Sequence, residues 1–317
     1  MADAYDLTGK SAYVAGHAGM AGQAIVRVLD HAGCRVLTAP RTLDLREQTK
    51  VREWFADNRP EVVIIAAARA GGIMAHRERP AEFAYDNVMI AANLIDTAAR
   101  HAVERLVFVA SSAIYPRGAA QPIKESAFLQ GAPDPGHLGY AIAKIAGATL
   151  CDTYRAQYGC DFMTAVPTNL YGPGDRYDPV KSHVVPALIR KAHEAKIAGN
   201  EAMTIWGTGT PRRELLFVDD FAEACAHLVK HGQGGGLFNV GTGEDIAIRD
   251  LAALVAETVG FRGKIVTDPA KPDGAQGKRI DSTRLRATGW RPKTDLRSGL
   301  AATYRDFLSR GDGGVAA

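Results

Sequence analysis

The sequence predicts an α/β protein with a doubly wound parallel sheet and a smaller α/β lobe that binds substrate. Three observations lead to this fold class. Continuously apolar runs alternate with segments of helical spacing in the first half, a glycine-rich turn follows the first run, and the pattern changes after Leu170. Strands that are apolar throughout, rather than at every second residue, are typical of a parallel sheet covered on both faces.

Five apolar runs form the predicted sheet, and they lie at 11–16, 34–39, 61–68, 105–112 and 161–169. The intervening segments have the apolar spacing of helices, as at 20–33 and 81–102. We therefore predict a dinucleotide-binding domain of Rossmann type over 8–170, with a returning segment at about 214–245.

The second half is less regular. A loop rich in Pro, Gly and Asp precedes a predicted helix near 184–199, and further predicted elements lie at 203–207, 217–232, 236–243 and 248–260. We assign 171–213 and 246–310 to a substrate-binding lobe, which makes this lobe non-contiguous. The tail at 311–317 is predicted to be disordered.

The bulk composition excludes several classes of protein. The hydrophobic share is 46%, the charged share 23% and the net charge +3, which is ordinary globular usage without basic blocks, so we expect neither a nucleic-acid partner nor disorder. No apolar run approaches the roughly 18 residues of a membrane span. The four cysteines lack metal-site or redox spacing, so we expect buried thiols in a reducing cytoplasm and no metal: Cys34, Cys151, Cys160 and Cys225.

The glycine turn is the first functional motif. Gly16, Gly19 and Gly22 lie between a predicted strand and a predicted helix. Glycine lets such a turn close and lets a pyrophosphate approach the N–H groups at a helix N-terminus. Tight turns need glycine too, so the triplet alone is weak evidence. Its position after the first strand favours a dinucleotide.

The end of the second predicted strand distinguishes the two nicotinamide coenzymes. An acid there would hold a ribose 2′-hydroxyl, whereas an arginine accommodates a 2′-phosphate. This strand leads into Arg41 and has no acid before Asp44. The sequence therefore favours NADP(H), the alternative being that Arg41 is a solvated loop cation.

A second motif follows downstream. Tyr140 and Lys144 are four residues apart on a predicted helix, so they share one face, where the lysine could lower the pKa of the phenol. Ser111 ends the fourth predicted strand, and ligands bind at that end of such sheets. Each feature alone has an ordinary structural explanation. Together they indicate hydride transfer between a nicotinamide and a carbinol or carbonyl carbon.

These motifs resemble those of extended short-chain dehydrogenases/reductases, and most closely the GDP-L-fucose synthase family. The similarity extends through the chain, in the segments VAGHAGMAG, AAARAGGI, SSAIYP, YAIAKIAG, PTNLYGP, SHVVPAL, WGTGTPRRE, VDD, NVGTG and KPDG. The resemblance implies NADPH-dependent reduction of the C4 keto group of a GDP-linked 6-deoxyhexose, after epimerisation at C3 and C5.

The resemblance also implies roles for particular residues. Ser111, Tyr140 and Lys144 would form the reductive triad, and His183 would be the general acid of epimerisation. Taken alone, His183 could be a loop or capping residue. The further cofactor-binding residues implied are Met20, Ala67, Pro167 and His183, and the substrate-binding residues are Ser111, Ser112, Asn169, Arg190, Trp206, Arg213 and Lys278. Arg213 suits a diphosphate, whereas Arg190 could equally be a solvated helix residue.

Two positions depart from the family pattern. Ala113 occupies the place of a cysteine that takes the proton from the sugar carbon, and a methyl group cannot accept a proton. Ser112 would need its own base, and its side chain is expected to face the other side of the strand. Epimerase activity is therefore doubtful, and a Cys→Ala variant of a bifunctional enzyme would look identical in sequence. Ala18 stands where related enzymes usually have a basic residue near the cofactor phosphate.

Other functions remain open from the sequence. A nucleotide-sugar dehydratase or 4-epimerase would share the fold, but a dehydratase would be expected to have an acidic pair after the serine strand. A silent NADP(H)-binding sensor would typically lack Tyr140 or Lys144. The resemblance also implies a homodimer through two long helices, for which 81–102 and the Tyr140 helix are candidates, although their apolar faces could equally be core.

Overall fold

The structure, a computed structural model, describes residues 4–71, 73–178, 182–232, 235–271, 273 and 276–310, so the predicted tail at 311–317 lies outside the described residues. Six strands form the larger sheet in the order β2-β1-β3-β4-β5-β9, and every pairing is parallel. They are β1 (Ser11–Ala15), β2 (Arg35–Leu37), β3 (Val62–Ile65), β4 (Arg105–Val109), β5 (Phe162–Pro167) and β9 (Gly236–Val240). The predicted doubly wound sheet is confirmed.

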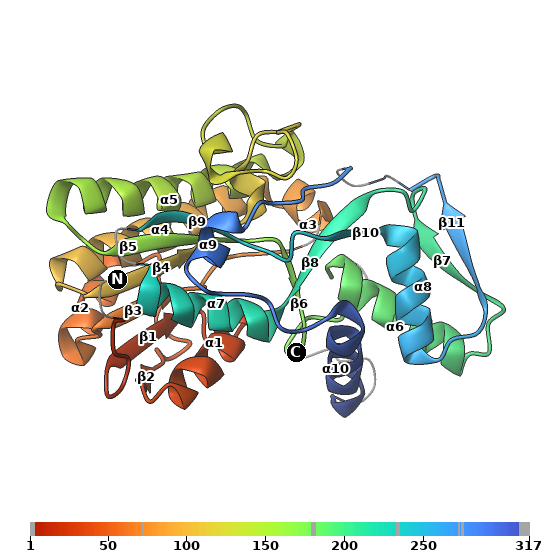
Figure 1. The fold of residues 1–317 in the computed structure, drawn as a ribbon, viewed down its shortest axis with the longest axis horizontal. Coiled ribbons are helices and arrows are strands. Elements are labelled where there is room, and N and C mark those ends of the chain that lie inside the picture. Colours follow the sequence, from red (N-terminus) through yellow and green to blue (C-terminus); the bar gives the residue numbers. More distant parts are fainter. Residues whose placement is uncertain are drawn as a thin grey trace.

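Helices cover both faces of this sheet (Figure 1). On one face lie α1 (Met20–His31) and α7 (Val218–His231), and on the other lie α2 (Gln48–Asn58), α4 (Pro80–Arg100) and α5 (Leu138–Tyr158). Every residue of β1, β3, β4, β5 and β9 is buried. This burial explains why the strands read as continuous apolar runs rather than alternating ones.

The strand order places a topological switch point beside β1. The chain leaves β1 for β2 on one side and continues with β3 on the other, so the connections diverge at the carboxyl ends of β1 and β3. Such a point opens a crevice in which ligands of doubly wound sheets bind.

The second lobe is a smaller α/β unit, drawn on the right of Figure 1. Strand β8 (Arg212–Phe217) pairs in parallel with β6 (Asn169–Tyr171) and antiparallel with β10 (Asp245–Ala247). A two-stranded parallel sheet joins β7 (Ala202–Trp206) and β11 (Lys264–Asp268). The lobe has its own apolar core around α6 (Val184–Ile197), α8 (Ile248–Val259) and α10 (Leu296–Ser309).

Two short helices complete the framework of the site. They are α3 (Ile73–Glu78), which follows β3, and α9 (Thr283–Ala287), which packs near β9. Within the residues that the structure describes, no helix is both long and apolar enough to cross a bilayer. The same residues contain no group of three or more His, Cys, Asp or Glu arranged to hold a metal ion.

Candidate active site

The glycine turn lies at the switch point and fits a pyrophosphate. Gly16 has φ +87, and a Cβ there would be 2.6 Å from the backbone nitrogen of Ala67, so only glycine allows the turn to pack on the end of β3. Gly19 caps α1 without a side-chain hydrogen bond, and the first turn of α1 has no acid. The N–H groups at this helix end are therefore available to an anion.

A groove of about 810 Å³ begins at this turn and runs between the loops that follow β2 and β3. Its lining includes Gly16, Gly19, Arg41 and Ala67, which the sequence predicts to bind the cofactor. The glycine cradle, the open helix end and the adjoining groove are together what an extended dinucleotide requires. Met20 is the half-buried first residue of α1, and Pro167 is buried at the end of β5.

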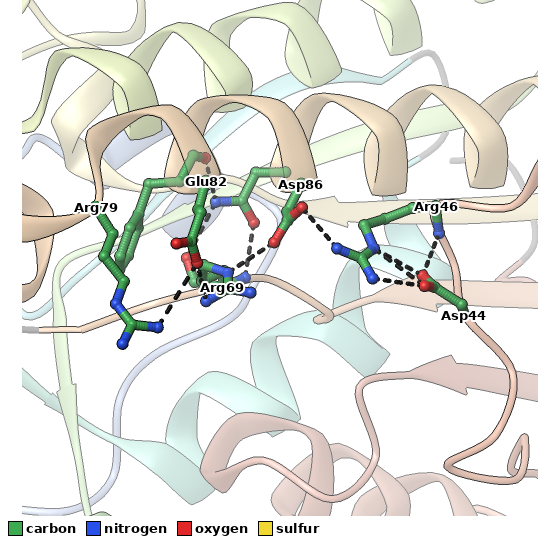
Figure 2. Close-up of polar contacts among 8 residues, drawn as sticks. Asp44, Arg46, Arg69, Arg79, Glu82 and Asp86 are labelled. Carbon is green, nitrogen blue, oxygen red and sulfur yellow. Dashed lines mark hydrogen bonds and ion pairs between the residues drawn. The ribbon is translucent and has the colours of Figure 1, made fainter.

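A chain of ion pairs borders the groove (Figure 2). The Asp86 side chain, only 8% exposed, accepts from Arg46 at 3.0 Å and from Arg69 at 2.7 Å. Arg46 also pairs with Asp44, and Arg69 also pairs with Glu82. Asp86 on α4 therefore ties together the loops after β2 and β3.

Arg41 differs from the other two arginines of the groove. Arg46 and Arg69 are neutralised by carboxylates, whereas Arg41 is exposed and has no carboxylate partner among the residues that the structure describes. A guanidinium in the loop after β2, without a carboxylate partner in the described part of the chain, offers its full charge to a phosphate. This arrangement favours the phosphorylated coenzyme.

The reactive residues come from β4 and α5. Ser111 follows β4 by two residues, and its hydroxyl interacts with the Tyr140 phenol on α5 and opposes the rise in its pKa. Lys144 is buried one turn along α5 and donates to the carbonyl of Val109 at 2.6 Å. Gly147 allows this close approach, because a Cβ there would overlap the ring of Phe108 in β4. The phenol, the hydroxyl and the ammonium thus converge at the carboxyl end of the sheet.

The pKa values differ from the sequence expectation. Burial raises the pKa of Tyr140 to about 12, opposed only by the hydrogen bond with Ser111, and burial lowers the pKa of Lys144 to about 7. The expected lowering of the phenol pKa by Lys144 is wrong for this structure, because the lysine nitrogen is directed to Val109 and lies 5.8 Å from the centre of the Tyr140 ring. A phenol of high pKa stays protonated at neutral pH, and donating a proton to a ketone requires that state.

The turn after β4 does not continue the strand. β4 ends at Val109, and Ser111 caps a short 3₁₀ helix, Ser112–Ile114, by accepting from the backbone N–H of Ala113 at 3.2 Å. The expectation that Ser112 faces the other side of a strand is therefore wrong, since side chains do not alternate in a 3₁₀ turn. The methyl group of Ala113 lies on this turn.

Three histidines gather near Tyr140, and the sequence singled out only one. His183 immediately precedes α6 and is solvent-exposed, and its pKa is lowered first by desolvation and then by its proximity to His137. The ring of His76, on α3, lies 4.9 Å from His137 and 5.4 Å from Tyr140, centre to centre. Burial also lowers the pKa of His137, and it lowers that of His76 to about 4, so the His76 imidazole is neutral at neutral pH. Neither His76 nor His137 belongs to a motif, and only their contacts identify them.

Two of the predicted substrate residues of the second lobe, Lys278 and Arg213, approach the reactive residues. Lys278 donates to the carbonyl of Ser112 at 3.4 Å, which brings its ammonium to the turn after β4. The charges of Lys278 and Arg213 both lower the pKa of His137, after the effect of burial. Asn169 is an exposed residue at the start of β6 and donates to the carbonyl of Glu214 at 3.1 Å.

Of two other predicted substrate residues, Arg190 is partly buried and Trp206 is exposed. Arg190 on α6 pairs with Glu194 at 2.6 Å and donates to the carbonyl of Tyr177 at 2.8 Å, so its guanidinium already has partners. Trp206 is 46% exposed at the end of β7, with the ammonium groups of Lys191 and Lys271 at 5.2 and 5.7 Å from its ring centre. An exposed indole of this kind could stack on a planar base.

The sheet, the glycine turn at its switch point and the Tyr140–Lys144 pair define an NADP-dependent oxidoreductase with an extended short-chain dehydrogenase/reductase fold. Residues 12–241 match the NAD dependent epimerase/dehydratase family, so the chain belongs to that family. Within it, the chain is similar to the GDP-L-fucose synthases. It is 50% identical over 306 residues to the one from Sinorhizobium fredii, covering 96% of this chain and 98% of that protein. It is 45% identical over 311 residues to the one from Escherichia coli, covering 95% and 97%.

Solved structures show the same similarity. A GDP-6-OMe-4-keto-L-xylo-heptose reductase from Campylobacter jejuni superposes with a TM-score of 0.90 at 31% identity, covering 97% of this chain and 100% of that chain. A GDP-mannoheptose C4 reductase from the same organism, with NADP bound, gives a TM-score of 0.84 at 32% identity, covering 95% and 98%.

Proposed function

We propose that this protein uses NADPH to reduce the C4 keto group of a GDP-linked 4-keto-6-deoxy sugar. The observation that carries the proposal is the convergence of Tyr140, Ser111 and Lys144 at the carboxyl end of the sheet that also bears the glycine-lined groove. Similarity to GDP-L-fucose synthases along nearly the whole chain supports the substrate class. We assign the groove of the larger sheet to the coenzyme and the adjoining second lobe to the GDP-sugar.

Each residue of the triad has a distinct task in this reduction. Bound NADPH supplies a hydride to the carbonyl carbon. Tyr140 donates its proton to the carbonyl oxygen, and Ser111 donates a hydrogen bond to the same oxygen as negative charge develops there. Lys144, held against β4, fixes the end of α5 that carries Tyr140. In the sugar lobe, Arg213 and Lys278 supply positive charge for the diphosphate, and Asn169 a polar contact.

A product analysis tests the reaction. Purified protein is incubated with GDP-4-keto-6-deoxymannose and NADPH, oxidation of the coenzyme is followed by absorbance, and the sugar product is identified by NMR. We expect stoichiometric oxidation and a C4 alcohol. Tight NADPH binding with no turnover of any GDP-linked keto sugar would instead favour a sensor.

We further propose that epimerisation at C3 and C5 is lost or greatly weakened, because Ala113 offers no proton acceptor on the turn that carries Ser111. The test is incubation of the keto sugar with the protein in heavy water without NADPH. We expect slow exchange at C3 and C5, and faster exchange in an Ala113→Cys variant. Rapid incorporation of deuterium at C3 or C5 by the unmodified protein would contradict this proposal.

A homodimer and a cytoplasmic location complete the proposal. Exposed apolar side chains lie on α4 and α5, namely Tyr85 (62% exposed), Leu138 (48%) and Ile142 (47%), which suits burial against a second copy. The cysteines are unpaired, as in a reducing compartment. Light scattering on the purified protein tests the dimer, and a monomer mass at micromolar concentration would contradict it.

A further inference from the structure

Glu214 is a fully buried carboxylate in the second lobe that joins three segments far apart in the sequence. It lies on β8 with 0% exposure. One side-chain oxygen accepts from the backbone N–H of Gly243 at 2.7 Å, and the other accepts from the backbone N–H of Ile280 at 2.8 Å. Gly241 leaves room for this carboxylate, because a Cβ at that position would overlap it. The side chain thus ties β8 to the turn after β9 and to the loop before α9.

The main chain of the same residue holds a fourth segment. The Glu214 carbonyl accepts from the hydroxyl of Thr168 at 2.8 Å and from the side-chain amide of Asn169 at 3.1 Å. Thr168 and Asn169 lie where the chain passes from the larger sheet into β6. Glu214 therefore also anchors the point at which the second lobe begins.

The anchored segments carry the cations and the amide that we assign to the GDP-sugar. Arg213 precedes Glu214 in β8, Asn169 is held by its carbonyl, and Lys278 lies two residues before the anchored Ile280. We propose that Glu214 is a positioning residue that assembles the nucleotide-sugar pocket, because its carboxylate holds the strand of Arg213 against the loop of Lys278 while its main-chain carbonyl holds Asn169. This inference rests on the proposed function.

A carboxylate is suited to this position. A buried carboxylate is costly unless it is hydrogen-bonded, and backbone N–H groups that meet a negative charge make shorter and stronger bonds. Burial raises the pKa of Glu214, while the N–H groups of Ile280 and Gly243 act in the opposite direction. An amide could satisfy only one of these two donors, because its nitrogen donates rather than accepts.

Isothermal titration with GDP and, separately, with NADPH tests the role of Glu214. In Glu214→Gln, one acceptor becomes an NH2 group whichever way the amide turns. We expect GDP affinity to fall about tenfold or more, as the loss of a charge-assisted bond implies, and NADPH affinity to stay within about twofold. A substitution that only destabilised the protein would not lower the affinity for GDP while leaving the affinity for NADPH unchanged.

Asp220 offers a matched control. It is also a buried carboxylate, 3% exposed, and it accepts from the backbone N–H of Thr294 at 2.9 Å and from the hydroxyl of the same residue at 3.2 Å. Asp220→Asn should lower the free energy of unfolding without lowering the affinity for GDP. If Glu214 acts through the loop before α9, Glu214→Gln should lower GDP affinity less in a Lys278→Met background than in the wild-type protein. If Glu214→Gln does not fold, Glu214→Asp takes its place, because it keeps the charge and shortens the side chain. We expect the same fall in GDP affinity for that variant.

The outcomes separate this inference from the proposed function. Unchanged GDP affinity in the Glu214 variant overturns the inference and leaves the proposed function standing. Wild-type protein that binds GDP but reduces no GDP-linked keto sugar overturns only the proposed function. Wild-type protein that does not bind GDP overturns both.

Discussion

In the groove at the switch point, Asp86 holds its neighbours through side-chain ion pairs, whereas in the second lobe Glu214 holds its neighbours through backbone N–H groups. The arginine partners of Asp86 remain half-exposed, with side chains 43% and 37% accessible. The partners of Glu214 are main-chain groups around a carboxylate with no exposure at all. Both are single carboxylates that connect loops far apart in the sequence.

The difference reflects how each half is built. The groove lies on a sheet whose parallel pairing already fixes the carboxyl ends of β1 and β3, so Asp86 only adjusts two loops. The second lobe has two small sheets of short strands and draws segments from distant parts of the chain, so the buried carboxylate of Glu214 supplies a connection that these sheets do not. We expect salt to weaken the half-exposed ion pairs of Asp86 and to leave the buried hydrogen bonds of Glu214 unchanged.

The largest expected effect belongs to neither anchor. Tyr140→Phe removes the proton donor, and general acid catalysis contributes about 100- to 10,000-fold, so kcat should fall by that factor. Titration should show GDP and NADPH binding unchanged, because both anchors remain. Steady-state rates and titration on the same preparation test this expectation.

Tyr115→Phe is the matched control for this substitution. Tyr115 is another buried phenol, and it donates to the side-chain oxygen of Asn239 at 2.6 Å. Its loss leaves that oxygen unsatisfied, which should lower the free energy of unfolding by about 1 to 3 kcal/mol while kcat changes little. A Tyr140→Phe enzyme that kept its rate would contradict the role of the phenol.

An intermediate effect is expected on the coenzyme side alone. Arg41→Ala removes the exposed guanidinium of the groove, and a lost charge-assisted bond corresponds to an increase of about 10- to 100-fold in KM for NADPH. KM for NADH should be unchanged, as should GDP affinity. Arg35→Ala, at the opposite end of β2, is the control. Equal losses for both coenzymes would mean that Arg41 does not bind the 2′-phosphate.

The sequence could predict what depends on local pattern. Burial on both faces makes strands such as β3 and β4 apolar throughout, and glycine is required where Gly16 touches the end of β3. The spacing of Tyr140 and Lys144 places both on one helix face, and the structure brings that face to Ser111. These expectations concern neighbours in sequence or a standard strand order.

The rest depends on contacts that no local pattern carries. Glu214 meets Ile280, which is 66 residues away, and His76 meets Tyr140 only after α3 packs against the start of α5. The expected orientation of Ser112 failed because periodicity does not show where a strand ends and a 3₁₀ turn begins. The pKa of Tyr140 likewise depends on burial, which the spacing to Lys144 does not reveal.

The smallest expected effect is the one that tests the comparison of the two anchors most directly. Asp86→Asn should raise KM for NADPH about threefold at about 0.05 M salt, because the ion pairs that connect the loops after β2 and β3 are lost. At about 0.5 M salt exposed ion pairs are screened, so the ratio of the variant KM to the wild-type KM should fall towards one. Asp96→Asn, which breaks similar arginine pairs further along α4, should leave KM unchanged. The GDP affinity ratio for Glu214→Gln should be the same at both salt concentrations, since its hydrogen bonds are buried. Taking ratios removes the salt dependence of the anionic ligands themselves. If the KM ratio for Asp86→Asn and the GDP affinity ratio for Glu214→Gln both fell as salt increased, Asp86 and Glu214 would not differ in their sensitivity to salt.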